Sequence, residues 1–93
     1  MKLVWDENKN RINQSKHSVS FETAQYVFDD PLHVSSQDRI EGDEQRWQTV
    51  GLVHGVVLLI VAHTVTEADG QETIRIISAR KADKTERRIY EQG

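Results

Sequence analysis

The sequence has no cysteine, which excludes a disulfide framework, a thiol nucleophile and a cysteine-based zinc site. Its longest apolar run, Val56 to Ala62, is far below the roughly 20 residues that a membrane-spanning helix needs. The opening residues MKLVWDENKN lack the apolar stretch of a signal peptide. These absences favour a cytoplasmic protein without a membrane segment, and the ordinary apolar and charged fractions, 37% and 29%, predict one domain over residues 1–93.

The formal net charge is only −3, but the charged residues are unevenly distributed along the chain. From Glu22 to Glu44 there are seven acidic residues against one basic residue, whereas from Arg75 to Arg88 there are six basic residues against two acidic ones. The second segment could therefore contact phosphate. The acidic stretch from Asp29 to Glu44 faces either water or a basic partner.

The first third of the chain predicts a short strand and two helices. Residues 3–5 have the composition of a strand, and Asp6 can cap a helix that runs to about Lys16. Ser20 is the expected N-cap of a second helix, which Pro31 ends. The polar stretch 37–44 is expected to be irregular.

The rest of the chain predicts a sheet and a final helix. Residues 46–53, 56–64 and 72–79 have β composition, and the nearly all-apolar middle segment belongs at the centre of the sheet. Asp83 and Glu86 have the spacing of a capping box for a helix to about Glu91. The order β-α-α-β-β-β-α predicts an α+β fold in which helices pack on an antiparallel sheet.

Two geometric expectations concern polar residues on these strands. If His54 and Gly55 form a two-residue hairpin turn, Arg46 pairs with His63, although a one-residue bulge would abolish that register. Because Arg75 and Arg80 differ by an odd number, strict alternation places them on opposite faces unless Arg80 has already left the strand.

Three separated motifs carry a resemblance to a known family. They are WDENKN..N..KHSVSFETAQYVFDDP near the start, Glu44-x-Arg46, and RIISARKAD..ER.IY from Arg75 to Tyr90. In this order, over Leu3 to Tyr90, they resemble the BrnT family of type II toxin-antitoxin ribonucleases. The resemblance implies a RelE-like fold, RNA cleavage, and a BrnA-like antitoxin with a ribbon-helix-helix domain through which the complex would bind operator DNA.

The sequence departs from that family at one position. The usual KHGV is here KHSV, with serine at position 18. If the backbone there has positive φ, serine is strained and the geometry around His17 changes.

RNA cleavage without a metal needs a base, an acid and cationic donors for the phosphoryl group. Arg46, Arg75 and Arg80 match the family motifs, and a guanidinium donates two parallel hydrogen bonds to phosphate. His17 and His63 are the candidates for proton transfer. No His-x-x-x-His or comparable spacing indicates a metal site, and no cofactor is expected. The candidate RNA contacts are Lys81, Lys84, Arg87 and Tyr90.

Each candidate also has a structural interpretation. Arg75 could form an ion pair with an acidic residue of the first two helices, and Arg80 could be solvated or bonded to the carbonyls at a helix end. His17 could cap the first helix, and His63 could be one polar residue among others at a strand end. Tyr90 could pack the last helix on the sheet, and Glu86 could complete the capping box or orient an arginine.

The function that the sequence favours is a metal-independent endoribonuclease. The alternative is a non-catalytic module of the same fold that binds RNA or protein.

Overall fold

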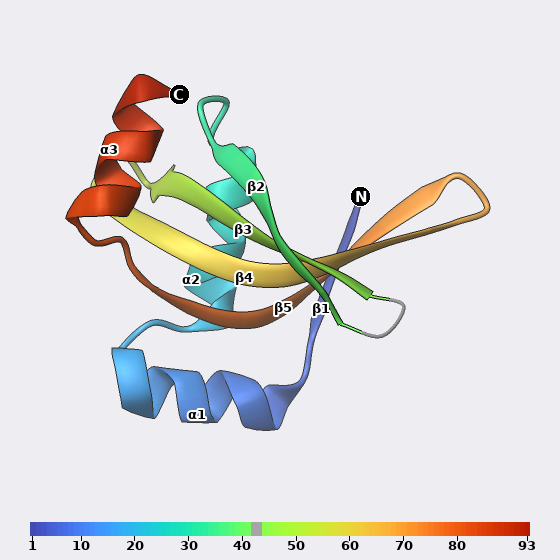
Figure 1. The fold of residues 1–93 in the computed structure, drawn as a ribbon. Coiled ribbons are helices and arrows are strands. Elements are labelled where there is room, and N and C mark those ends of the chain that lie inside the picture. Colours follow the sequence, from blue (N-terminus) through green and yellow to red (C-terminus); the bar gives the residue numbers. More distant parts are fainter. Residues whose placement is uncertain (42–43) are drawn as a thin grey trace.

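Five strands form one sheet in the computed structural model, which describes residues 1–41 and 44–93 and only the backbone of 39–41 (Figure 1). In sheet order the strands are β1 (Lys2–Trp5), β5 (Gln71–Lys81), β4 (Val57–Ala68), β3 (Glu44–Val53) and β2 (Val34–Glu41). Strand β1 is parallel to β5, and the other neighbours are antiparallel. The predicted α+β fold is confirmed, with a sheet that is mixed rather than antiparallel.

Helices cover the two faces of the sheet unequally. Their bounds are α1 (Glu7–His17), α2 (Phe21–Ala24), the 3-10 helix η1 (Gln25–Asp29) and α3 (Lys84–Gln92). Side chains of α2 and η1 share a buried core with Val53, Leu59 and Ile76, on what we call the helix face. Helix α3 packs through Tyr90 on the smaller cluster around Val50 at one end of the opposite face.

The helices begin where the local sequence predicts. Asp6 accepts hydrogen bonds from the backbone N–H of Asn8 and Lys9 at 2.8 and 3.2 Å. Ser20 accepts one from Thr23. Both bonds of the predicted capping box between Asp83 and Glu86 are present. These side chains satisfy N–H groups that have no partner inside their helices.

Close packing of η1 on the sheet depends on a glycine. A Cβ atom at Gly51 would lie 2.7 Å from the carbonyl oxygen of Val27. The absence of a side chain therefore lets η1 approach β3 and bury Val27 completely.

The prediction that residues 37–44 are irregular was wrong for 37–41 and 44, because β2 runs from Val34 to Glu41 and pairs with β3, while residues 42–43 lie outside the described residues. It is an edge strand, and residues 35–38 are exposed. Such a strand has no apolar alternation to reveal it in the sequence. A bulge at Asp38 further interrupts its period of two.

The predicted register between β3 and β4 was also wrong by one residue. Val53 pairs with Val57, so three residues form the loop, and His54 and Gly55 both have positive φ, 54° and 69°. Arg46 consequently pairs with Thr64, and His63 pairs with Trp47. A shift of one residue reverses the face on which every partner lies.

A bulge in β5 overturns the expected separation of Arg75 and Arg80. Ser78 pairs with Ala62 and Ile76 with His63, which leaves Ile77 without a cross-strand partner. The extra residue shifts the alternation of side chains by one position. Arg75 and Arg80 therefore lie on the same face of the sheet, although both belong to β5.

Buried asparagines attach α1 to the edge of β5 that lies beyond β1. Asn13 donates to the carbonyl of Ala79 at 2.8 Å and accepts from its N–H at 3.1 Å, which imitates a neighbouring strand. Asn10 is fully buried and accepts from the N–H of Phe21 at 2.9 Å. The side chains of Asn13 and Asn10 therefore pair with buried backbone groups of Ala79 and Phe21, which lie outside α1.

The end of α1 yields a prediction on stability. Ser18 has φ 58° and ψ 28°, the left-handed conformation that its replacement of glycine raised as a concern. Because an L residue is disfavoured there, Ser18→Gly should raise the free energy of unfolding by about 1 kcal/mol in urea denaturation.

The matched control is Ser15→Gly within α1. Glycine at this exposed helical position should lower the free energy of unfolding by about 0.5 kcal/mol. Equal losses in both variants would contradict strain at Ser18.

Candidate functional site

Three arginines share the sheet face opposite α2 and η1, which we call the arginine face. Arg46 and Arg75 both pair with Thr64 of the strand between them, so their Cα atoms lie roughly 10 Å apart. Arg80 pairs with Ile60, four residues from Thr64 along β4 and therefore about 13 Å away. Side chains from these positions can reach neighbouring phosphates of one extended strand.

A hollow of about 50 Å³ lies between Arg80 and the row that holds Arg46 and Arg75. Gln48, Ala62 and Ser78 form the row of paired residues beneath it, and Ile60 and Arg80 complete its lining. Small side chains at Ala62 and Ser78 leave this space open. A polar amide and a hydroxyl therefore face the same place as the Arg80 guanidinium.

Arg80 is held by Glu86 in a two-bond ion pair. Its two terminal nitrogens each donate to one carboxylate oxygen at 2.8 Å, and the first also donates to the Lys81 carbonyl at 3.2 Å. Within the described residues the Nε of Arg80 donates to no acceptor. The edge formed by Nε can therefore still bind a phosphate side-on.

Glu86 has a second role at the start of α3. Its Oε1 accepts from the backbone N–H of Asp83 at 2.9 Å as part of the capping box. The hydrogen bonds from Arg80 lower the pKa of Glu86, since they favour the charged carboxylate, although burial opposes them. Both sequence interpretations of Glu86 therefore hold together, because one carboxylate caps the helix and orients the arginine.

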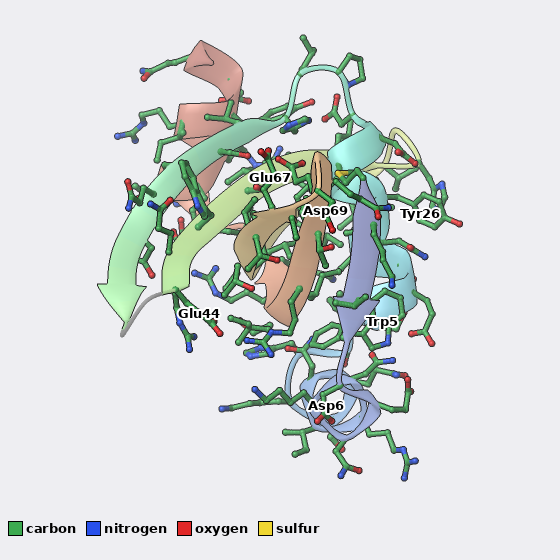
Figure 2. The ribbon with its side chains drawn as sticks, turned by 90° about the vertical axis from the view of Figure 1, so that its right-hand side faces the viewer. Trp5, Asp6, Tyr26, Glu44, Glu67 and Asp69 are labelled. Carbon is green, nitrogen blue, oxygen red and sulfur yellow. The ribbon has the colours of Figure 1, made fainter. Side chains whose placement is uncertain are left out.

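Arg75 makes a much looser ion pair. One of its terminal nitrogens donates to both oxygens of Glu44, at 2.8 and 3.0 Å, while the two side chains remain 53% and 41% exposed. Figure 2 shows Glu44 at the start of β3, on the side of the sheet toward β2. Exposed pairs contribute about 0–1 kcal/mol, so a phosphate can displace Glu44 from Arg75 at small cost.

His63 lies away from the arginines, in the interior of the helix face. It is 3% exposed, its Nε2 lies 2.7 Å from the Thr49 hydroxyl, and the Phe28 ring packs edge-on at 5.1 Å. Burial lowers the pKa of His63 to about 4, because the charged imidazolium is poorly solvated there. The structure does not bring it together with Arg46.

His17 is half-buried in the last turn of α1, at the edge of β5. It lines a cavity of about 190 Å³ with Ile77 and Ser78. Ser78 also lines the hollow of the arginine face. His17 therefore lines a cavity that shares one residue with the hollow of the arginine face.

The four candidate RNA contacts occupy different surfaces. Lys84 and Arg87 are exposed on α3, whereas Lys81 lines a cavity of about 350 Å³ beside α2. Tyr90 packs on the Val50 cluster, and its hydroxyl donates to Asp30 at 2.6 Å. These contacts are the ones expected if Tyr90 packs the last helix on the sheet.

Sequence reasoning missed several residues that organise this region. Asn10 and Asn13 belong to the first motif, yet only their burial in a polar helix reveals their role. Asp30 accepts from Tyr90 and also from the N–H of Leu52 at 2.8 Å, which ties α3 to β3. Nothing in the local sequence distinguishes Asp30 from its exposed neighbour Asp29.

Two features of the described residues bear on other classes of protein. No three His, Asp or Glu side chains among them gather as a metal site would require. No helix among them is long and apolar enough to cross a membrane.

Comparisons with known proteins bear on the family and the fold. The model of the family described as "Ribonuclease toxin, BrnT, of type II toxin-antitoxin system" matches residues 5–86. Among solved structures, the crystal structure of the Brucella abortus ribonuclease toxin BrnT superposes with a TM-score of 0.63 at 22% identity, covering 90% of this chain and 99% of that one. That likeness concerns the fold. No curated protein matches the sequence.

The buried imidazole gives a prediction on pH. An unfolded histidine titrates near pH 6.5, above the folded pKa of about 4, so the unfolded state binds more protons and stability falls as the pH decreases. Between pH 7 and pH 5 the free energy of unfolding should drop by about 2 kcal/mol in urea denaturation.

The variant His63→Asn should lose this decline, whereas His54→Asn should keep it, since His54 is exposed in the hairpin loop. A decline that persists unchanged without His63 would show that another group causes it.

Proposed function

The chain belongs to the family of BrnT ribonuclease toxins of type II toxin-antitoxin systems, and from this premise we propose that it cleaves RNA on the arginine face of its sheet. One observation carries the proposal. The bulge at Ile77 places Arg46, Arg75 and Arg80 on one face, around a hollow that also presents Gln48 and Ser78. This is a cluster of cationic donors on rigid strands, as phosphate chemistry requires.

The proposed step is attack of a ribose 2′-oxygen on the adjacent phosphorus. A bond forms between that oxygen and phosphorus, the bond to the 5′-oxygen breaks, and negative charge increases on the non-bridging oxygens. Arg80, already oriented by Glu86, stabilises this charge through its Nε edge. Arg75 exchanges Glu44 for a phosphate, and Arg46 binds the strand on the other side of β4.

Proton transfer completes the proposed mechanism. A base removes the proton of the 2′-hydroxyl, and an acid protonates the leaving 5′-oxygen. We assign one of these transfers to His17, because its cavity and the hollow share Ser78. His63 takes no part, since it is buried on the helix face.

The bound strand continues from the hollow toward α3, where Lys84 and Arg87 are exposed. Arginines supply the charge stabilisation that a divalent cation provides in other nucleases, so we propose that the reaction needs no metal.

An RNA-cleavage assay in EDTA tests the site. The wild-type protein should cleave, and Arg80→Ala should lower kcat/KM by about 10²–10³-fold, the usual effect of removing one transition-state donor. Glu86→Gln keeps an oxygen that accepts from Asp83 but loses the ion pair, so an intermediate loss is expected. Arg11→Ala, on exposed α1, is the matched control and should retain full activity.

Thermal unfolding of each variant separates a loss of function from a loss of fold. Full activity of Arg80→Ala would remove that residue from the site, and inhibition of the wild type by EDTA would contradict metal independence. RNA that is bound in a salt-sensitive manner but left intact would favour the non-catalytic module.

A toxin of this type has an antitoxin partner, and we propose that it is a BrnA-like ribbon-helix-helix protein through which the complex binds operator DNA. The acidic stretch from Asp29 to Glu44, of which Gly42 and Asp43 lie outside the described residues, suits a basic segment of such a partner. An adjacent reading frame encoding such a protein is expected. Its product should co-purify with this chain and suppress cleavage, and failure to do either would refute the assignment.

A further inference from the structure

The cavity of about 190 Å³ beside His17 lies where α1 meets the edge of β5. Helix α1 runs along β5 on the side of the sheet away from β2 (Figure 1). Strand β1 pairs with β5 only as far as Ile76, so no described strand covers this edge at Ile77 and Ser78. Both residues are half-buried and line the cavity. Since Ser78 also lines the hollow of the arginine face, the two spaces meet at the edge of the sheet.

The α1 side of this cavity is cationic. Lys9, Asn13 and Lys16 share one face of the helix, because residues three and four positions apart are neighbours on its surface. These three side chains and His17 line the cavity. Buried Asn13 holds the face against Ala79 through two hydrogen bonds. The lysines lie one turn to either side of it, with Cα atoms about 10 Å apart along the axis.

No carboxylate neutralises this cationic face within the part of the chain that the structure describes. Neither lysine makes a side-chain hydrogen bond or an ion pair there. The lining of the cavity contains no aspartate or glutamate. Glu7 and Glu22, from α1 and α2, both accept from the amide of Asn10, which does not line the cavity. Two like charges without a counter-charge create a positive potential that attracts an anion.

The size of the cavity limits which anion can enter. Sites for whole small molecules usually enclose about 300–1,000 Å³, and this cavity is smaller. It therefore suits one charged group of a longer ligand. A phosphodiester fits this description, and lysine binds phosphate as a point charge that needs no fixed geometry. The exposed ammonium groups can reach such a group at the surface without entering the protein.

We propose that Lys9 and Lys16 bind an RNA phosphate next to the one at the hollow, so that the strand crosses the edge of β5 at Ser78. This inference rests on the proposed cleavage on the arginine face and adds a subsite to it. Contacts to neighbouring phosphates fix the register of a strand and carry no base preference. The lysines thus position the strand, whereas the arginines act on the reacting phosphate.

Fluorescence anisotropy with a short 2′-O-methyl oligoribonucleotide tests the subsite, because this strand has no free 2′-hydroxyl and stays intact. The cavity variant, Lys9→Gln with Lys16→Gln, should bind about tenfold more weakly than the wild type at low salt. The slope of log affinity against log salt concentration should become shallower by about 0.7, the contribution of one phosphate of a single strand.

The control variant, Arg11→Gln with Lys2→Gln, removes the same number of charges from residues that do not line the cavity. Its affinity should stay within about twofold of the wild type, because exposed charges beyond a Debye length are screened. All four substituted side chains are exposed, so both variants should unfold at the wild-type temperature. An equal loss of affinity in the two variants would overturn the proposal, since net charge alone would then explain it.

Cleavage of unmodified RNA by the wild type is measured in parallel, so the two proposals can fail separately. If the wild type cleaves and the cavity variant keeps its affinity and salt slope, the subsite alone is refuted. If the cavity variant binds more weakly while the wild type leaves RNA intact, the subsite stands and cleavage is refuted. A wild type that does not bind the strand would overturn both.

An acidic protein segment is the other polyanion that two lysines could bind. Polyglutamate of equal charge should compete with the labelled strand far less effectively than the unlabelled strand does, since only the strand also engages the arginines through phosphate. Equal competition by polyglutamate, lost in the cavity variant, would overturn the proposal in favour of an acidic protein partner.

Discussion

The unpaired residue Ile77 is the constraint on which the arrangement of the sheet depends. Without this bulge, Arg80 would lie on the helix face, where Val61 and Ala79 are packed in the core. Asn13 bonds both backbone groups of Ala79, two residues after the bulge, and so fixes the strand after its parity has changed. A polar helix that contributes little to the core thereby maintains the geometry of the arginine face.

Features that depend on neighbouring residues could be predicted from the sequence. The caps at Asp6, Ser20 and Asp83 follow from residue types a few positions apart, and the apolar composition of β4 places it at the centre. Register and bulges depend instead on how separate strands meet. One additional loop residue after Val53 was enough to move His63 from beside Arg46 to the opposite face.

The candidate site likewise combines features that nearby residues predict with features that depend on how separate segments meet. Motif positions identified the three arginines, and residue chemistry indicated phosphate. Burial could not be predicted from residue type, since His17 and His63 are both histidines and only His63 is enclosed. The alternation of β3 and β5 gives the same strands two distinct surfaces, one cationic and one aromatic, within the thickness of a single sheet.

Because one carboxylate caps α3 and holds Arg80, the orientation of the arginine is coupled to the first turn of that helix. Apart from this carboxylate, Arg80 donates only to the Lys81 carbonyl within the described residues. A molecule that binds the start of α3 would therefore act on the orientation of Arg80 without contacting the sheet.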